Sequence, residues 1–219
     1  MAHLKRHIIP KNWPIPRKGT TFVVRPTSKI ELGVPILIAL RDMLKQAEDR
    51  REVKKAIHNK LVRINDRLVR DEKNTLSLFD TLTLIPSNKS YRLTMNEFGK
   101  FEFENIKPEE SFKKVAKVID KKVLKGKKTQ INLSDGRNYL IKDAPNYKTN
   151  DSVVVNLKDK KIEKKLELKK GAKVFVFQGK HTGKFGTIKD IDEKHKRYGI
   201  ELKNKETISV LVSFLIVVE

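Results

Sequence analysis

The segment LRDMLKQAEDRREVKKAIHNKLVRINDRLVRD, residues 40–71, combines two helical patterns with a hairpin pattern and organises the rest of the chain. Basic residues in its middle lie at helical positions i, i+3, i+4 and i+7: Arg51, Lys54, Lys55 and His58. This spacing places them on one face of a helix, and Val53, Ala56 and Ile57 fall on the opposite face. We therefore predict an amphipathic helix whose apolar face packs on a core. Its basic face, here called the basic stripe, suits a phosphate backbone.

An earlier helical pattern precedes the basic stripe. Pro35 is well placed to open this first helix, which we expect to run to about Gln46. Its buried side would consist of Leu37, Leu40 and Leu44. Arg41 and Lys45 stand four residues apart on the same segment, which adds two more candidate phosphate contacts.

The second helix and the segments after it complete a small unit, residues 35–90. Asp49 followed by Glu52 has the pattern of a capping box and predicts the start of this helix. Short apolar runs on both sides of Asn65-Asp66 predict a hairpin. Residues 81–85 alternate in polarity and predict a further strand. The expected order is therefore helix, helix, hairpin and strand.

Composition points to a polyanionic partner. The chain has 219 residues, with 49 Lys and Arg against 27 Asp and Glu, a net charge of +22 and a pI near 10.0. Such an excess favours nucleic acid as a permanent partner, and the length allows one to three modest domains. Cysteine is absent, which excludes disulfides, cysteine–zinc sites and thiol catalysis. The first residues lack the pattern of a secretory signal, and no apolar run is long enough to cross a membrane. We expect a soluble, cytoplasmic protein.

Residues 1–34 form a basic N-terminal arm. Its first 29 residues have no acidic side chain, and its prolines interrupt any continuous helix. We predict an extended arm that is poorly ordered in the free protein and becomes ordered along RNA phosphates. Trp13 would either pack against the protein's own body or stack on a base, and packing is the favoured interpretation.

Residues 91–170 have the pattern of a β-rich domain. Three pairs of strand-like runs flank turn signals at residues 96–99, 134–137 and 158–160, and they predict three hairpins in a small barrel or curled sheet. A short helical turn is expected near Pro108. The basic run KKVLKGKK, residues 121–128, is either an RNA contact or an exposed loop. This domain has no recognisable catalytic chemistry.

Residues 171–219 predict a C-terminal barrel of five strands. An alternating strand leads into a loop with glycine at positions 179, 183 and 186, which suits a tight crossing between strands. Exposed amides beside Lys180 and Lys184 would suit phosphate oxygens. The loop is not a P-loop, because no Gly-Lys-Ser/Thr sequence follows a strand and opens a helix.

These segments together resemble a known family. Residues 36–85, with the turn NDRLV, resemble the alpha-L RNA-binding module of ribosomal proteins, pseudouridine synthases and tyrosyl-tRNA synthetases. The spacing Val-x-x-Gly-x-x-x-Gly-x-x-Gly-x-Ile from Val176 is similar to the KOW motif of SH3-like barrels. With the arm motifs HLKR, from His3, and PKNW, from Pro10, the whole chain resembles the small-subunit ribosomal protein of archaea and eukaryotes known as protein four of the eukaryote-type series. The chain stops after the predicted barrel, without the basic tail of eukaryotic members, which favours the archaeal type.

The resemblance implies a fold and a function. The fold would be α+β and multidomain, with the basic arm, a helix–helix–hairpin RNA-binding module, a central β-rich domain and a C-terminal SH3-like KOW barrel. The function would be non-enzymatic: binding small-subunit ribosomal RNA beside neighbouring ribosomal proteins in the cytoplasmic ribosome, without cofactor, metal or small-molecule substrate. The expected RNA contacts are Lys5, Arg6, Lys11, Arg17, Lys18, Arg41, Lys45, Arg51, Lys54, Lys55, His58, Arg63, Lys180, His181 and Lys184, with Arg67 as a weaker candidate.

Other interpretations remain possible from the sequence. An RNA-modification enzyme or an assembly factor could use an alpha-L module, but an enzyme would also need a catalytic domain. A transcription factor with a KOW motif is less compatible with the alpha-L pattern. The basic stripe could also be an ordinary solvated face. A metal site is not expected, because the histidines lack cysteine or carboxylate partners at ligand spacing.

Overall fold

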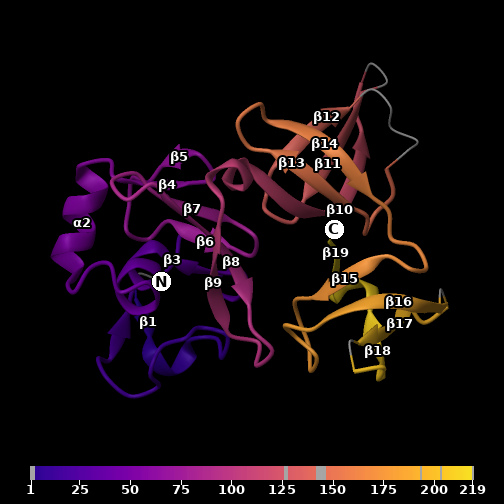
Figure 1. The fold of residues 1–219 in the computed structure, drawn as a ribbon, viewed down its shortest axis with the longest axis horizontal. Helices are drawn as coiled ribbons and strands as arrows, with labels where there is room; N and C mark the ends of the chain where they lie inside the picture. The colour runs from indigo at the N-terminus through magenta and orange to yellow at the C-terminus, as the bar shows by residue number, and fades with distance from the viewer. Residues whose placement is uncertain (1–2, 126–127, 142–146, 193, 203, 219) are drawn as a thin grey trace. The chain divides into compact units, whose positions relative to one another are not determined.

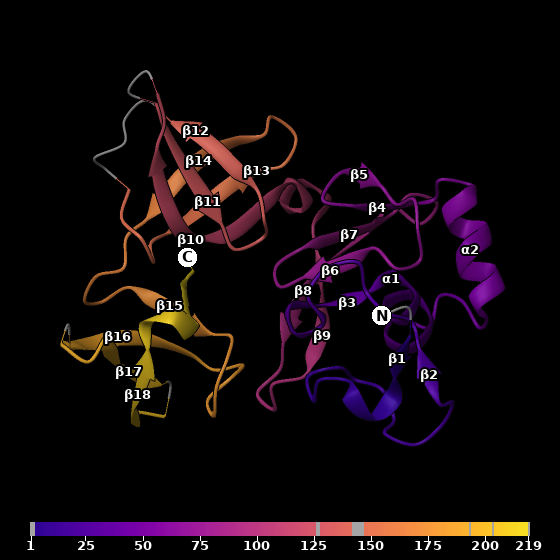
Figure 2. The same ribbon diagram turned by 180° about the vertical axis from the view of Figure 1, so that it is seen from behind.

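The chain is mostly β with few helices (Figure 1). The computed structural model describes residues 3–125, 128–141, 147–192, 194–202 and 204–218. The chain divides into two compact units, Met1–Phe112 and Lys113–Glu219, and each is described by itself. Figure 2 shows the same elements from behind.

The first unit is built on a five-stranded antiparallel sheet with the order β5-β4-β7-β8-β9. Two short ladders, β1-β2 and β3-β6, lie outside this sheet. Its elements in chain order are β1 (Leu4–Lys5), η1 (Arg6–Ile8), β2 (Phe22–Val23), η2 (Ile30–Leu32), β3 (Gly33–Pro35), α1 (Ile36–Ile38), η3 (Ala39–Met43), α2 (Arg50–His58), β4 (Val62–Ile64), β5 (Arg67–Leu68), β6 (Thr75–Ser77), β7 (Thr81–Leu84), β8 (Lys89–Met95), β9 (Phe101–Ile106) and η4 (Pro108–Phe112). The helical turn expected near Pro108 is therefore confirmed as η4.

The arm folds onto the first unit instead of extending from it. Leu4 and Trp13 are each only 3% exposed, and the N–H of Phe101 in β9 donates to the carbonyl of Asn12 at 2.8 Å. The expectation that the arm has too little apolar surface to pack is wrong for the described residues, and the packing role of Trp13 is confirmed. The prediction considered only the few apolar residues of the arm, whereas the body supplies the rest of the buried surface.

The first helix differs from its prediction. It consists of α1 followed by the π-helical turn η3, and it ends at Met43 rather than near Gln46. Residues 36–40 are all buried, so the helix is enclosed by the unit instead of presenting one apolar stripe. Lys45 lies beyond the helix with a φ of 51°, and it therefore does not share a helical face with Arg41.

Helix α2 has the faces predicted for it. Val53 and Ile57 are buried, and the opposite side is exposed. Asp49 has the extended conformation of an N-cap residue, but its side chain makes no capping hydrogen bond. The carboxylate of Glu52 instead accepts from the N–H of Glu48 at 2.8 Å, one residue earlier than a capping box requires.

The hairpin after α2 forms as predicted. Asn65 and Asp66 both have positive φ, 50° and 61°, as in the two central residues of a type I′ turn. The turn joins β4 to β5, and β7 pairs with β4 on the other side.

The second unit contains two five-stranded antiparallel sheets, with the orders β12-β11-β10-β13-β14 and β18-β17-β16-β15-β19. Their elements are β10 (Lys113–Val123), β11 (Thr129–Leu133), β12 (Asn138–Ile141), β13 (Ser152–Asn156), β14 (Lys161–Leu166), β15 (Lys173–Val176), β16 (Phe185–Asp192), β17 (Arg197–Leu202), β18 (Thr207–Leu211), η6 (Val212–Phe214) and β19 (Leu215–Val217). Each sheet has its own apolar core. The N–H of Val217 donates to the hydroxyl of Ser152 at 2.9 Å and ties one sheet to the other.

The three predicted hairpins are present, but they do not belong to one sheet. The first, β8-β9, continues the sheet of the first unit, and β8 crosses the predicted boundary between residues 90 and 91. The other two flank β10, a long strand that the sequence patterns did not indicate. They therefore form a sheet that needs β10 at its centre.

Candidate nucleic-acid interface

An ion pair between Arg50 and Glu72 anchors the N-terminal end of α2. Glu72 is only 4% exposed, and Arg50 donates from Nε to its two carboxylate oxygens at 2.8 and 3.0 Å. The hydrogen bond from Arg50 holds the pKa of Glu72 below its usual value, although burial acts in the opposite direction. The backbone of Glu72 also accepts from the N–H of Leu37, so α2 is tied to the chain that supports α1. Sequence reasoning missed Arg50, because nothing local marks Glu72 as its partner.

The basic stripe faces solvent. All four of its side chains are exposed. Lys54 lies 3.9 Å from Glu72 and is partly engaged by it. Within the part of the chain that the structure describes, Arg51, Lys55 and His58 form no ion pair, so they present their charge outward.

A groove continues from the C-terminal end of α2 along the β4-β5 hairpin. It has a volume of about 1110 Å³. Its lining residues are Ile57, His58, Lys60, Arg63, Asp66, Arg67, Leu68, Val69 and Arg70. We call it the basic groove, since Asp66 is its only acidic member and lies 3.4 Å from Arg63. His58 belongs to both the stripe and the groove, and the two form one continuous cationic surface. Lys60 and Arg70 were not predicted. Lys60 lies just after α2, and Arg70 joins it in the groove only when the hairpin folds.

The predicted contacts of the arm divide into two groups. Lys5, Lys11, Arg17 and Lys18 are exposed. Arg6 is directed into the arm itself: it donates to the carbonyls of Pro16 and Thr20 at 2.8 and 2.7 Å and to the Thr20 hydroxyl at 2.7 Å. These contacts close the loop between β1 and β2. Arg6 therefore holds the arm together, and its donors are not directed toward an external phosphate.

Arg41 is also engaged within the protein. Its guanidinium donates to both carboxylate oxygens of Asp42, at 3.2 and 2.8 Å, and the side chain is half-buried. Lys45 is exposed just after η3. Of the two charges predicted on the first helix, only Lys45 is fully presented to solvent.

The glycine-rich loop between β15 and β16 is held by its own amides. Gly183 donates to the carbonyl of Val176 at 2.8 Å, and Thr182 and Lys184 donate to carbonyls within the loop at 3.4 Å. The expectation that exposed amides here bind phosphate is wrong for these three groups. The side chain of Lys180 is exposed, whereas His181 and Lys184 are half-buried, so any anion would meet side chains more than backbone.

Gly183 has a φ of 88°, which side chains other than glycine rarely adopt. We expect Gly183→Ala to lower the free energy of unfolding by about 1–2 kcal/mol, because alanine is strained in the left-handed region. Lys184→Ala is the control and should change stability by less than about 0.5 kcal/mol. Urea denaturation followed by circular dichroism measures both. Equal stability of the two variants would contradict the argument.

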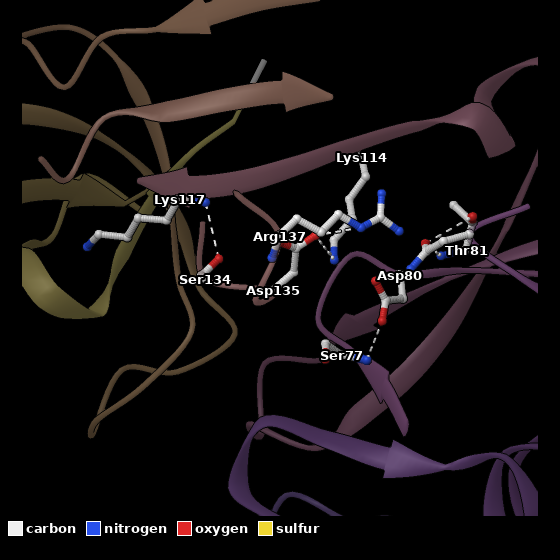
Figure 3. A network of polar contacts seen from close by, with 9 residues as sticks. Ser77, Asp80, Thr81, Lys114, Lys117, Ser134, Asp135 and Arg137 are labelled. Atoms are coloured by element: carbon white, nitrogen blue, oxygen red, sulfur yellow. Dashed lines mark hydrogen bonds and ion pairs between the residues drawn. The ribbon is translucent and has the colours of Figure 1, made fainter. Parts of the chain in front are cut away.

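Some lysines of this basic chain are buried and unavailable to any partner (Figure 3). The ammonium of Lys114 lies 3.1 Å from the carboxylate of Asp135, and the Arg137 guanidinium lies 3.5 Å from the same carboxylate. Burial alone would raise the pKa of Asp135, but the charges of Lys114 and Arg137 and the Arg137 N–H hold it below its usual value. Lys117 is likewise buried on β10. Net charge therefore overstates the cationic surface of the second unit.

Histidine positions do not form a metal site. Among the described residues, no three His, Cys, Asp or Glu side chains gather at metal-ligand distance. Contrary to expectation, His195 does have a carboxylate partner, because its Nδ1 lies 2.8 Å from Asp192. This hydrogen bond lowers the pKa of Asp192.

The basic run at residues 121–128 is described only in part. Lys121 donates to the carbonyl of Tyr147 at 3.4 Å, while Lys122, Lys125 and Lys128 are exposed. Residues 126–127 of the run lie outside the described residues. Within the described ranges, no helix has both the length and the apolar character that a membrane span requires.

Known proteins are similar to this chain over most of its length. Residues 87–162 match the family model described as Ribosomal family S4e, and residues 2–28 match the RS4NT (NUC023) domain. The small ribosomal subunit protein eS4 of Nanoarchaeum equitans is 37% identical over 199 residues, covering 87% of this chain and 84% of the relative. The eS4 protein of Methanocella arvoryzae is 34% identical over 192 residues, covering 86% and 80%.

A solved structure supports the same relationship. The crystal structure of the 30S ribosomal protein S4e from Thermoplasma acidophilum is similar with a TM-score of 0.73 and 25% identity, over 85% of this chain and 95% of that one. The sequence relatives cover more than four-fifths of this chain at above 30% identity. The chain therefore belongs to the ribosomal protein S4e family.

Proposed function

We propose that this protein is a structural constituent of the small ribosomal subunit and binds its ribosomal RNA through the basic stripe and the basic groove. The observation that carries the proposal is the continuous cationic surface on α2 and the β4-β5 hairpin, in which Arg51, Lys55 and His58 are exposed. Phosphate groups match this surface in charge, and such contacts release counterions. The relatives named as small ribosomal subunit proteins favour this RNA over others.

The helix–helix–hairpin order of the first unit supports an alpha-L module as the RNA-binding element. The polar side of α2 and the outer side of the hairpin would grip a folded RNA helix. Backbone contacts would supply affinity, and the shape of the groove would supply selectivity. Lys5, Lys11, Arg17 and Lys18 on the arm would add further phosphate contacts.

The sheet β18-β17-β16-β15-β19 and its glycine-rich loop support a KOW-type element in the second unit. Its positive-φ glycines at 179 and 183, with φ of 96° and 88°, agree with the narrow loop that the motif requires. Lys180 would then contribute a peripheral phosphate contact.

Membership of the S4e family also argues against the RNA-modification enzyme that shares the alpha-L module. Both relatives are named as ribosomal proteins. The alignment with this chain covers 80% or more of each relative. A modification enzyme would need a catalytic domain in addition to the RNA module. We therefore assign the protein a binding and structural role in the ribosome.

Salt dependence tests the interface directly. Arg51→Ala combined with Lys55→Ala should weaken binding to small-subunit ribosomal RNA transcribed from the source genome. It should also reduce the log–log salt slope by about 1.5, since each phosphate contact contributes about 0.7–0.9. Both side chains are exposed, so the fold should be unchanged. Filter binding at salt concentrations from about 50 to about 400 mM gives the slope.

A matched control removes the same charge elsewhere. Lys158→Ala with Lys161→Ala lowers the net charge equally at exposed positions in the β13-β14 hairpin. It should leave the slope unchanged. Equal slopes for the two double variants would show that α2 is not the contact face. Recovery of the wild-type protein mainly in light fractions of a sucrose gradient, instead of with salt-washed small subunits, would contradict the ribosomal role.

A further inference from the structure

The basic groove is lined by apolar as well as cationic side chains. Leu68 is 43% exposed, and Ile57 and Val69, which line the same groove, are 8% and 4% exposed. Leu68 pairs with Arg63 across the β4-β5 ladder, so the two side chains leave the same face of the hairpin. Arg63 thereby adds an apolar stem and a planar guanidinium beside the exposed leucine.

The charge of the lining is positive after its acidic residues are counted. Its Lys and Arg residues are all exposed: Lys60, Arg63, Arg67 and Arg70. Asp66, the one acidic lining residue, lies 3.4 Å from Arg63. Asp71 follows Arg70 in the chain, and its carboxylate accepts from the N–H of Lys73 at 3.1 Å. The groove therefore keeps positive charge for an anionic ligand that also has an apolar surface.

A continuous RNA duplex does not match this lining. An A-form helix presents phosphates, 2′-hydroxyl groups and base edges, and the faces of its bases are stacked inside it. An exposed leucine gains little from polar groups, because its burial is favourable only against apolar surface. A nucleotide outside the stack presents a base face together with its phosphates. Arginine suits both parts, since its guanidinium stacks on bases and pairs with phosphate.

The groove also has room for such a nucleotide. Its volume is about 1110 Å³, and pockets for drug-sized molecules measure roughly 300–1,000 Å³. We propose that the basic groove receives an unpaired nucleotide of the ribosomal RNA. The base packs on Leu68 and Arg63, and the phosphates lie among the other cationic side chains of the groove. This inference rests on the proposed function for the identity of the RNA, and it gives the groove a different role from the basic stripe, which contacts backbone.

Leu68→Ala distinguishes an apolar contact from a phosphate contact. The variant should bind small-subunit ribosomal RNA about five- to tenfold more weakly, the low end of what losing a stacked base costs. Its log–log salt slope should equal that of the wild type, because an apolar contact releases no counterion. Arg51→Ala with Lys55→Ala lowers the slope instead. Filter binding over the same salt range measures both quantities.

A matched leucine provides the control. Leu211 is 37% exposed and also pairs with an arginine across a ladder, Arg197 of β17, but it does not line the groove. Leu211→Ala should leave the affinity unchanged. Trp13 fluorescence during urea denaturation shows whether Leu68→Ala keeps the fold of the first unit. Wild-type affinity of a folded Leu68→Ala, or a weaker affinity that comes with a smaller salt slope, would overturn the proposal.

Cross-linking identifies the nucleotide in the assembled particle and does not depend on the folding of Leu68→Ala. The photoreactive residue p-benzoylphenylalanine is placed at position 70 in the groove, or at position 55 on α2, in the full chain within isolated small subunits. We expect position 70 to cross-link to an unpaired nucleotide, mapped by reverse transcription. Dimethyl sulfate or a carbodiimide should modify the Watson–Crick edge of that base in subunits that lack the protein.

The outcomes separate this proposal from the proposed function. A cross-link from position 70 only to paired nucleotides or to a protein, or none there while position 55 reacts with RNA, would overturn the nucleotide site and leave the RNA interface of α2 standing. An absence of RNA cross-links at both positions would contradict the proposed function as well. A cross-link to an unpaired base at position 70 without one at position 55 would support the groove and contradict the basic stripe.

Discussion

We expect Gly33→Ala to lower the free energy of unfolding of the first unit by about 3 kcal/mol or more, at the upper end of overpacking effects. The backbone of Gly33 is fully extended, with φ of −173° and ψ of −178°, so its conformation suits any residue. The obstacle is space. An added Cβ would lie 2.1 Å from the carbonyl oxygen of Leu76 and 2.8 Å from its carbonyl carbon. These are backbone atoms of β6, which cannot rotate away.

Separation of β3 from β6 would disturb the site as well as the core. Val34 and Leu76 are fully buried in this ladder. The next residues donate to the segment before β6: Ile36 to the carbonyl of Asn74 at 2.9 Å, and Leu37 to that of Glu72 at 3.2 Å. Glu72 in turn holds α2 through Arg50. A shift of β3 should therefore loosen the support of the basic stripe.

The measurement uses the single tryptophan. Trp13 is buried in the first unit, so its fluorescence during urea denaturation reports on that unit. Gly199→Ala in β17 of the second unit is the control, because a Cβ there meets only ordinary contacts, the nearest being 3.4 Å from Asp190. Its stability is followed by far-ultraviolet circular dichroism, since Trp13 reports on the first unit. It should be neutral or slightly stabilising, since glycine weakens a strand interior by roughly 0.5–1 kcal/mol relative to alanine. An unchanged Trp13 transition in Gly33→Ala would show that the ladder can spread without cost.

The basic stripe could be predicted from sequence because its information is local. The spacing of Arg51, Lys55 and His58 depends only on helical periodicity, and Val53 and Ile57 indicate the buried side. The hairpin turn at Asn65-Asp66 is local in the same sense, since the turn itself requires positive φ. These elements agree with their predictions.

The basic groove and the arm could not be predicted because they depend on tertiary contacts. Arg70 and Lys60 become neighbours only when the hairpin folds beside α2. Arg6, like Lys5 and Lys11, is a basic residue in a basic segment. It nevertheless closes a loop by donating to the carbonyls of Thr20 and Pro16, which are 14 and 10 positions away. A basic residue in a basic segment does not reveal whether its donors are satisfied internally.

Strand β10 and the first helix were mispredicted for a related reason. The lysines of β10 interrupt the polarity pattern of a strand, and Lys114 and Lys117 are nevertheless buried. The first helix is apolar on all sides over residues 36–40, so no stripe exists from which its end could be deduced. In both places, tertiary packing determines which side chains are buried, and the periodicity of the sequence does not show it.

Lys117 provides the second large expected effect, a rise in stability with pH. The side chain is 4% exposed, and its ammonium donates to the carbonyls of Val212 at 2.6 Å and Ser213 at 3.2 Å. Burial lowers the pKa of Lys117 from 10.5 to about 8. In the unfolded chain the same lysine keeps its proton to about pH 10.4. Between these values the unfolded state binds more protons, so stability increases as pH rises through this window.

The size of the effect follows from the difference between the two pKa values. A fall from 10.5 to about 8 corresponds to about 3 kcal/mol of unfolding free energy gained by pH 10.5, at about 1.4 kcal/mol per pKa unit. Lys117→Met removes this titration. The wild type should therefore gain about 3 kcal/mol more than the variant between pH 7 and 10.5. Urea denaturation followed by far-ultraviolet circular dichroism at several pH values measures both curves.

An exposed lysine controls for the general loss of positive charge at high pH. Lys158→Met also removes one titrating amine, but its side chain faces solvent, so its stability curve should run parallel to the wild type. Parallel curves for Lys117→Met as well would show that the carbonyls of Val212 and Ser213 compensate fully for burial and keep the ammonium charged. Divergent curves would show that the two sheets of the second unit are joined through an amine that is partly neutral near pH 8. In that case the interior of the second unit is stabilised when Lys117 loses its charge.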